Sequence, residues 1–344
     1  MKSTIEILYD GTNISADIAP FLEDFSYTDV MSGELDDISV TLRDERELWM
    51  GDWLPEKGAT LNAAILVHDW KFDGDNDRFN CGQFELDEID LKAPPHEVTL
   101  SAVSVPQKSK LRGEEKSRSW EKINLKAVAE QLAREAGMTL FYDTTAEIKY
   151  DRVEQSDQSD LAFLQKCCKD AGLALKVTDN QVVIFEESKY EQAEPLLRFL
   201  NPYFEGRRTA GADIYLKAWG FKSKIRDVYK ACHVKHMDSK KKSNIEYTFT
   251  DPNKKTGQTL QVNQQVTSIA EAERLAKNKL REKNKDEVTA TASLLADFRV
   301  CAGITVMLQG FRKFDGKYIV TKVTHKVGGG YSMDVEMRRC LNGY

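Results

Sequence analysis

The sequence predicts a mainly β protein in which a small α+β domain is inserted between two β-rich regions. Residues 1–105 contain several short segments where apolar and polar residues alternate between turn residues, which is typical of a β-sandwich or barrel. Residues 106–190 instead contain two stretches with apolar side chains three and four positions apart, the pattern of an amphipathic helix. Residues 191–344 return to strand-like alternation.

The first region opens with the clearest alternation. Ile5, Ile7 and Tyr9 occupy alternate positions, and the hairpin signal Asp10-Gly11 follows them. A period of two means that these side chains share one face of a strand. Further strands are predicted at residues 38–42, 61–67, 82–86 and 98–103.

The middle region repeats a helix–strand unit. A helix from Leu125 to Ala136 ends at Gly137 and precedes a strand at 138–142, and a second helix, capped by Ser159, ends at Gly172 before a strand at 173–177. The two Ala-Gly junctions are 35 residues apart. The charged stretch 108–118 before the first helix is predicted to be a linker, and 181–185 a strand that completes a hairpin.

The last region combines strands with one helix. Ser268 begins a capping box, which predicts a helix over about 268–283. Gly328–Gly330 is expected to be the tip of a hairpin between the final two strands. The strands predicted here are 214–220, 246–249, 288–294, 304–308, 317–327 and 331–338.

Composition limits the class of protein. The chain has 344 residues, of which 41% are hydrophobic and 30% charged, as in soluble globular proteins with two or three domains. Its net charge of −6 argues against a role in coating nucleic acid. No apolar run approaches the roughly 20 residues of a membrane span. The N-terminus is strand-like and does not resemble a signal peptide, so synthesis in the cytoplasm is expected.

The candidate metal sites fit poorly. Asp73–Asp77 places acidic residues as a calcium loop does, but Arg78 and Phe84 occupy the positions of the turn glycine and the bidentate ligand. A polar turn is therefore favoured. His233 and His236 lead into a lysine-rich stretch, which favours an exposed basic loop. The function consistent with such a loop is contact with a partner.

No catalytic residue, metal site or cofactor is predicted. The six cysteines form no CxxC pair and are expected to be free thiols. The basic residues of 108–118, together with Trp120, are interrupted by glutamates, which disfavours nucleic-acid binding. The motifs GxSxG and HExxH are absent, and the sequence singles out no pair among 55 acidic residues.

Two segments carry a resemblance to a known family. The first is the run QxxxSDxxFL that leads into the helix ending at Gly172, and the second comprises 302–306 followed by 310–325. Together they resemble the phage late control D family, the hub proteins of contractile tails and of phage-tail-like bacteriocins (tailocins). The resemblance assigns structural roles to Gln155, Ser159, Asp160, Phe163, Leu164, Gly172, Gly303, Phe314, Asp315, Gly316, Tyr318, Val320, Val323 and His325.

The resemblance implies an architecture and a set of partners. The family has two pseudo-symmetric β-barrel domains, here 1–105 and 191–344, with the α+β insertion 106–190 on the outside. A homotrimer of such chains joins the six-fold tail tube to a three-fold spike. The implied partners are the tail tube protein, a separate spike protein and other baseplate proteins, in a phage or phage-like particle. Neither specific nucleic-acid binding nor membrane insertion by this chain is implied.

Roles and alternatives follow from the same residues. Phe163 and Leu164 are expected to pack against the hairpin that follows their helix, Asp315-Gly316 to turn between strands, and Tyr318, Val320 and Val323 to pack inside or at a subunit seam.

The alternative function is a tail-tip hydrolase that degrades the cell wall through an unidentified acidic site. A cell-surface adhesion module is a third possibility, which the missing signal peptide disfavours.

Overall fold

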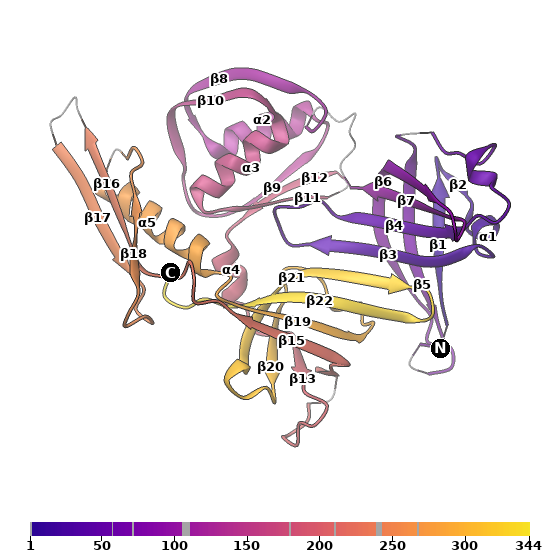
Figure 1. Cartoon of the computed structure of the whole chain (residues 1–344). Coiled ribbons are helices and arrows are strands. Elements are labelled where there is room, and N and C mark those ends of the chain that lie inside the picture. The colour runs from indigo at the N-terminus through magenta and orange to yellow at the C-terminus, as the bar shows by residue number, and fades with distance from the viewer. Residues whose placement is uncertain are drawn as a thin grey trace.

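The computed structural model describes residues 2–56, 58–70, 72–104, 111–178, 180–209, 211–238, 243–266 and 268–344. The mainly β class with an α+β insertion is confirmed. In Figure 1 the N-terminal β region lies at the right, the insertion at the top and the C-terminal β region below the centre. A small α/β unit lies at the left. Within the described ranges, no helix has both the length and the apolar character that a membrane span requires.

The N-terminal β region is a curved antiparallel sheet with the order β3-β4-β7-β6-β5-β1-β2. Alternate side chains of β4 are buried, which places Ile38, Val40 and Leu42 in the core as their spacing predicts. Its elements are β1 (Lys2–Tyr9), β2 (Thr12–Asn13), α1 (Ser15–Ile18), β3 (Leu22–Val30), β4 (Asp37–Arg43), η1 (Leu48–Met50), β5 (Thr60–His68), β6 (Asp77–Lys92) and β7 (Glu97–Val103).

The C-terminal β region is mixed. β13 pairs in parallel with β14 and β20, while β20, β21, β22, β19 and β15 pair antiparallel in that order. Gly328–Gly330 connects β21 and β22, as predicted. The elements are β13 (Leu197–Leu200), β14 (Asp213–Tyr215), β15 (Ala218–Ser223), β19 (Val288–Leu295), β20 (Thr305–Gln309), η2 (Arg312–Phe314), β21 (Gly316–Val327) and β22 (Tyr331–Arg339).

The two β regions are joined edge to edge. β21 pairs antiparallel with β3 from Lys322↔Val30 to Val327↔Phe25, which creates one 14-stranded sheet. One hydrophobic core runs through both regions and contains Phe25 from the first and Val323 from the second. The regions therefore share backbone hydrogen bonds as well as a core.

The insertion packs around a core of its own, formed by residues between Leu111 and Ile184. A long two-stranded antiparallel sheet of β8 and β10 wraps helices α2 and α3, and a second sheet has the order β11-β12-β9 (Figure 1). A helix followed by a strand occurs twice here, at α2–β9 and at α3–β11. The elements are β8 (Glu115–Asn124), α2 (Leu125–Glu135), β9 (Thr139–Asp143), β10 (Lys149–Ser159), α3 (Asp160–Ala171), β11 (Ala174–Thr178), β12 (Gln181–Phe185) and α4 (Glu187–Gln192).

The structure differs from what was predicted around two segments. The expected linker 108–118 becomes strand β8 from Glu115 onward, because its alternate side chains find partners on α2 and α3; residues 105–110 lie outside the described ranges. The predicted helix at 268–283 forms, and Ser268 caps it, but it covers a separate sheet with a core of its own. This small α/β unit consists of β16 (Tyr229–Asp238), β17 (Ser243–Thr250), β18 (Gln258–Val262) and α5 (Ile269–Asn284).

Candidate functional site

The first family segment forms a buried polar cluster around Asp160. Arg118 Nη2 and Gln155 Nε2 lie 2.6 and 2.8 Å from its Oδ1, and Lys116 Nζ lies 2.7 Å from its Oδ2. Burial acts to raise the pKa of Asp160, but the hydrogen bonds from Lys116, Gln155 and Arg118 outweigh it and leave the pKa below its usual range. The carboxylate is thus a charged link between β8, β10 and α3.

The ends of α3 follow from its sequence. Ser159 is extended, and its Oγ accepts a hydrogen bond from the Ala162 amide at 3.2 Å, which is an N-cap. Gly172 ends the helix with φ of 75°, a conformation that favours glycine. A Cβ there would also lie 2.3 Å from the side chain of Asn278 on α5. The two caps therefore fix where α3 begins and where it meets α5.

An aromatic pair completes this cluster. The rings of Phe163 and Trp120 stack at 5.2 Å with an interplanar angle of 9°, and the guanidinium of Arg118 lies 5.0 Å from the Trp120 ring. Leu164 is fully buried beside them. Phe163 thus has its ring partner on β8, before α3, as well as neighbours in the hairpin that follows.

Arg118 was predicted to lie in a linker and Trp120 just after it, and neither was predicted to belong to this cluster. The signal that could have found them is a period of two, because Lys116, Arg118 and Trp120 occupy alternate positions of β8 and the residues between them are exposed. The cations of this stretch are neutralised by Asp160 and Glu135.

Replacing Asp160 by asparagine is expected to lower the free energy of unfolding by about 1.5–3 kcal/mol, the value of hydrogen bonds to a charged group. The amide keeps the shape but leaves Arg118 and Lys116 without their carboxylate. Urea titration followed by tryptophan fluorescence measures the change. Glu154→Gln is the control, because Glu154 pairs with Arg152 in an exposed ion pair worth at most about 1 kcal/mol. Equal effects of the two substitutions would contradict the role of the cluster.

The second family segment shapes the start of β21. Asp315 Oδ1 accepts a hydrogen bond from the Phe311 amide at 2.5 Å, and the Tyr318 hydroxyl donates to the Phe314 carbonyl at 2.9 Å. Phe314 stacks on Phe221 of β15 with ring centroids 4.5 Å apart. Gly316 has a φ of 142° at the first residue of the strand. These contacts close the turn between β20 and β21.

The remaining residues of that segment lie in the sheet. Tyr318, Val320 and Val323 are fully buried in the shared core. The Gly303 amide donates to the Val320 carbonyl at 2.8 Å, and Gly303 has a φ of 92°. The structure therefore brings the residues of each family segment together, but it places the two groups in different cores.

His325 lies where the two β regions join. It is fully buried, it pairs with Tyr27 across β21 and β3, and its ring stacks on Phe79 at 4.8 Å. Its Nδ1 lies 2.6 Å from the Tyr331 hydroxyl, and among the described residues its Nε2 has no hydrogen-bond partner. Burial lowers the pKa of His325 to about 4, although Asp29 acts to raise it.

Stability is expected to fall as the pH decreases from about 6.5 to about 4. In that range the unfolded chain protonates this histidine while the folded chain keeps it neutral, so the unfolded state gains protons. The shift from 6.5 to about 4 corresponds to about 3 kcal/mol. Denaturant titrations of wild type and His325→Leu at several pH values measure it. In His325→Leu the free energy of unfolding should no longer fall between pH 6.5 and pH 4 through this histidine. His96→Gln, at an exposed site, should keep the wild-type dependence on pH. An unchanged slope in His325→Leu would contradict the expectation.

Two ion clusters attach the insertion to the β regions. In the first, which we call the junction cluster, Lys176 Nζ of β11 lies 2.5 Å from Asp29 Oδ1 and 3.2 Å from Asp36 Oδ1. It also donates to the Val30 carbonyl at 2.7 Å. Asp29 Oδ2 accepts the Ala302 amide at 2.8 Å. The junction cluster therefore ties the insertion to both β regions.

The second cluster surrounds α4. Arg338 of β22 donates to Glu187 at 2.8 Å and pairs with Glu191, while Arg281 of α5 lies 2.5 Å from Glu191. Burial acts to raise the pKa of Glu187, but the charges of Arg338, Lys285 and Arg281 outweigh it and lower the pKa. The insertion, the C-terminal β region and α5 meet at this one short helix. No local sequence pattern predicts either cluster, because their members lie far apart along the chain.

The acidic turn, the histidine pair and the cysteines, which were the remaining candidate metal ligands, form no metal site within the described residues. Within the described part of the chain, no group of three histidine, cysteine or acidic side chains could hold a metal ion. Gly74 lies in a turn, where its amide donates to Asp69 Oδ1 at 2.8 Å. His233 and His236 lie on β16, an odd number of residues apart, and so point to opposite faces; residues 239–242 of the expected basic loop lie outside the described ranges. All six cysteines are free thiols.

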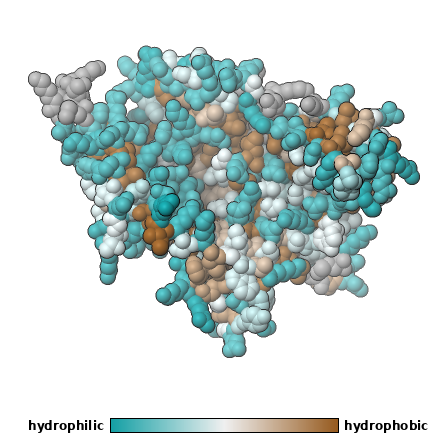
Figure 2. Space-filling model, viewed as in Figure 1, coloured by the Kyte–Doolittle hydropathy of each residue, from teal (hydrophilic) through white to brown (hydrophobic). Residues whose placement is uncertain are grey.

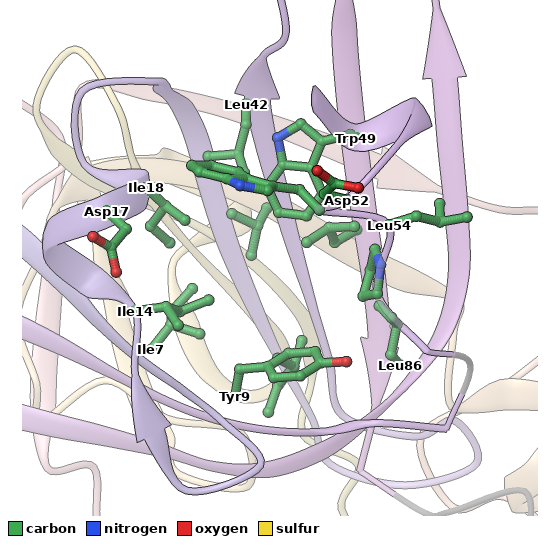
Figure 3. A pocket seen from close by; sticks show the side chains of 15 residues that line it. Ile7, Tyr9, Ile14, Asp17, Ile18, Leu42, Trp49, Asp52, Leu54 and Leu86 are labelled. Carbon is green, nitrogen blue, oxygen red and sulfur yellow. The ribbon is translucent and has the colours of Figure 1, made fainter. Parts of the chain in front are cut away.

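An apolar pocket opens in the N-terminal β region (Figure 3), with a volume of about 370 Å³. Trp49, Trp53 and Leu54 contribute from the segment between β4 and β5, and Asp17 and Asp52 lie on opposite sides of the pocket. We call it the apolar pocket. Its other lining residues are Ile7, Tyr9, Ile14, Ile18, Val40, Leu42, Pro55, Leu61, Leu86 and Leu100.

Solved structures with a similar fold come from tails and secretion systems. The 43 kDa tail protein of prophage MuSo2 from Shewanella oneidensis aligns with a TM-score of 0.72 at 10% identity, over 98% of each chain. A tail protein from Neisseria meningitidis MC58 gives 0.70 at 11% identity, over 98% of this chain and 97% of that one. At such identities the likeness shows the fold alone.

A third similar structure is the E. coli c3393 protein, a component of the type VI secretion system that is described as structurally similar to the T4 bacteriophage tail proteins gp27 and gp5. It aligns with a TM-score of 0.57 at 10% identity, over 100% of this chain and 79% of that one. A comparison with curated proteins gave no match. The sequence model of the family described as phage tail baseplate hub (GPD) matches residues 30–331. Because this match spans most of the chain and the fold agrees, the protein belongs to the phage tail baseplate hub family.

Proposed function

We propose that three copies of this chain form the hub of a baseplate and join a tail tube to a separate spike protein. Membership of the hub family supports the role in a tail or a related secretion particle. The observation that supports a hub of three copies is the pairing of β21 with β3, which makes the two β regions one continuous sheet. A ring of three copies offers six similar surfaces if each chain holds its two β regions at a fixed spacing and orientation.

The physical reason lies in matching symmetries. A six-fold tube meets a three-fold ring without mismatch only if each chain of the ring presents two equivalent surfaces. In this chain we assign those surfaces to residues 1–105 and 191–344, with 106–190 on the outside. The spacing of the two surfaces must not vary, and the shared core together with the two ion clusters resists such variation.

We propose a structural and not a catalytic role. The family is one of tail hub proteins. The hydrolase alternative requires an acidic catalytic site. Asp36 has the raised pKa of a candidate acid, because burial raises its pKa to about 6 although Lys176 acts to lower it. This carboxyl, however, is held inside the junction cluster by Lys176. We place the assembled protein in a phage or phage-like particle, with synthesis in the bacterial cytoplasm.

Affinity capture tests this function. The full chain is tagged in the producing cells, and the eluate is imaged by negative-stain electron microscopy with gold label on the tag. The expected result is tails or baseplates with the label on their axis. Free protein without particles would contradict the proposal. The same eluate is added to a cell-wall suspension, and clearing that depends on this chain alone would favour the hydrolase.

A further inference from the structure

The apolar pocket is flanked by an acidic segment, and two of its lining carboxylates have no ion-pair partner among the described residues. The segment from Asp44 to Glu56 carries five carboxylates and one arginine. Asp17 and Asp52, which lie on opposite sides of the pocket, form no ion pair with any described residue. Figure 2 shows hydrophobic residues gathered at the upper right of the molecule, over the N-terminal β region. The chemistry that fits this pocket is a large apolar side chain with cations beside it.

The chain itself presents such a group elsewhere. Ile225 is 93% exposed, an unusual position for a β-branched apolar residue. Its neighbours Lys222, Lys224 and Arg226 are also exposed and form no ion pair within the described ranges. The Lys224 amide donates to the Glu287 carbonyl at 2.8 Å, which fixes the base of this loop. We call residues 222–226 the basic knob.

The apolar pocket and the basic knob lie at different ends of the molecule. In Figure 1, α1 of the pocket lies at the right, whereas the basic knob leads from β15 toward β16 at the left. The knob of one chain therefore cannot enter its own pocket. A contact between two different surfaces of identical chains is heterologous, and it closes into a ring when the rotation between copies allows it.

We propose that Ile225 of one copy inserts into the apolar pocket of the next copy around the ring, with the knob's cations beside Asp17 and Asp52. This contact rests on the proposed trimer, and it would join each copy to the next so that the ring of three is complete. It is carried by charge complementarity: three cations near the exposed isoleucine, and two carboxylates that flank the pocket, form no ion pair with the residues that the structure describes. Burial of the isoleucine supplies affinity, and the charges select the orientation.

A disulfide trap tests the contact in assembled particles. Full chains carrying Asp52→Cys and Arg226→Cys are expected to form oxidant-dependent dimers and trimers on a non-reducing gel, while either substitution alone gives none. Asp52→Cys with Lys149→Cys is the matched control, because Lys149 is exposed on the insertion. Of the natural cysteines, five are buried, and Cys301 is half-buried. A cross-link to a different protein, or equal cross-linking in the control, would overturn the contact.

Charge reversal gives an independent test. Lys224→Glu with Arg226→Glu, and separately Asp17→Lys with Asp52→Lys, are each expected to reduce the yield of hub trimer at least tenfold in native mass spectrometry of particle extracts. A chain with all four reversals is expected to recover most of that yield. Trimers that form normally in both double variants would overturn this contact and leave the proposed function intact. Monomers alone in the wild type would overturn the proposed trimer.

Discussion

Replacing Phe163 by alanine is expected to lower the free energy of unfolding by about 3–5 kcal/mol, the range for removing a large aromatic side chain from a core. The ring is 1% exposed, stacks on Trp120 and fills the core of the insertion. The substitution leaves a cavity between β8 and α3, where the Phe163 ring now packs against Trp120. Urea titration followed by tryptophan fluorescence measures the loss, because Trp120 reports on this site directly.

The matched control is Phe141→Ala in the same domain. Phe141 lies on β9 with about half of its surface exposed, so its removal is expected to cost less than about 1 kcal/mol. Producing cells that express the Phe163 variant should also yield no intact particles. A stable variant that assembles at the wild-type level would show that this family segment is not a core element.

Replacing Lys176 by methionine is expected to cost about 3–5 kcal/mol at neutral pH, as when one partner is removed from a buried ion pair. Methionine matches the lysine stem but leaves Asp29 and Asp36 facing each other without a cation. The insertion should then loosen from both β regions. Differential scanning calorimetry is expected to show its unfolding as a separate transition.

The pH dependence of that cost has a defined sign. Burial raises the pKa of Asp36 to about 6, so the folded protein takes up this proton more readily than the unfolded chain. The stability that this proton contributes is present at low pH and is lost as the pH rises through about 6. The Lys176→Met penalty should therefore be smallest below pH 6. Adding Asp29→Asn and Asp36→Asn should restore most of the stability at pH 7, and a penalty that persists would contradict the electrostatic account.

Local signals predicted the elements well. The Ser159 cap, the helix stripe and Gly172 together specify α3, because caps and period depend only on nearby residues. The same holds for Ser268 and α5. The partners of these elements were not predictable in the same way. The charge of 108–118 suggested a linker, although residues 115–118 lie on strand β8, where Lys116 and Arg118 are neutralised by residues more than 15 positions away.

Long-range pairing is the part that sequence patterns could not supply. The β3–β21 ladder joins Tyr27 to His325, and nothing in either strand's alternation specifies the other as its neighbour. The family resemblance pointed to His325 but not to its burial among aromatic rings. The apolar pocket likewise depends on the Trp49–Leu54 segment folding back over the mouth of the N-terminal β region, which turn signals alone do not determine.

An electron cryo-microscopy reconstruction of the particle's baseplate, computed without imposed symmetry, tests the hub account most directly. Three copies of this chain are expected around the axis, with their six β regions in a ring between the tail tube and the spike. In that map Ile225 of each copy should lie in the apolar pocket of the next. A single copy at the axis, six copies, or a position of the chain away from the axis would contradict the account.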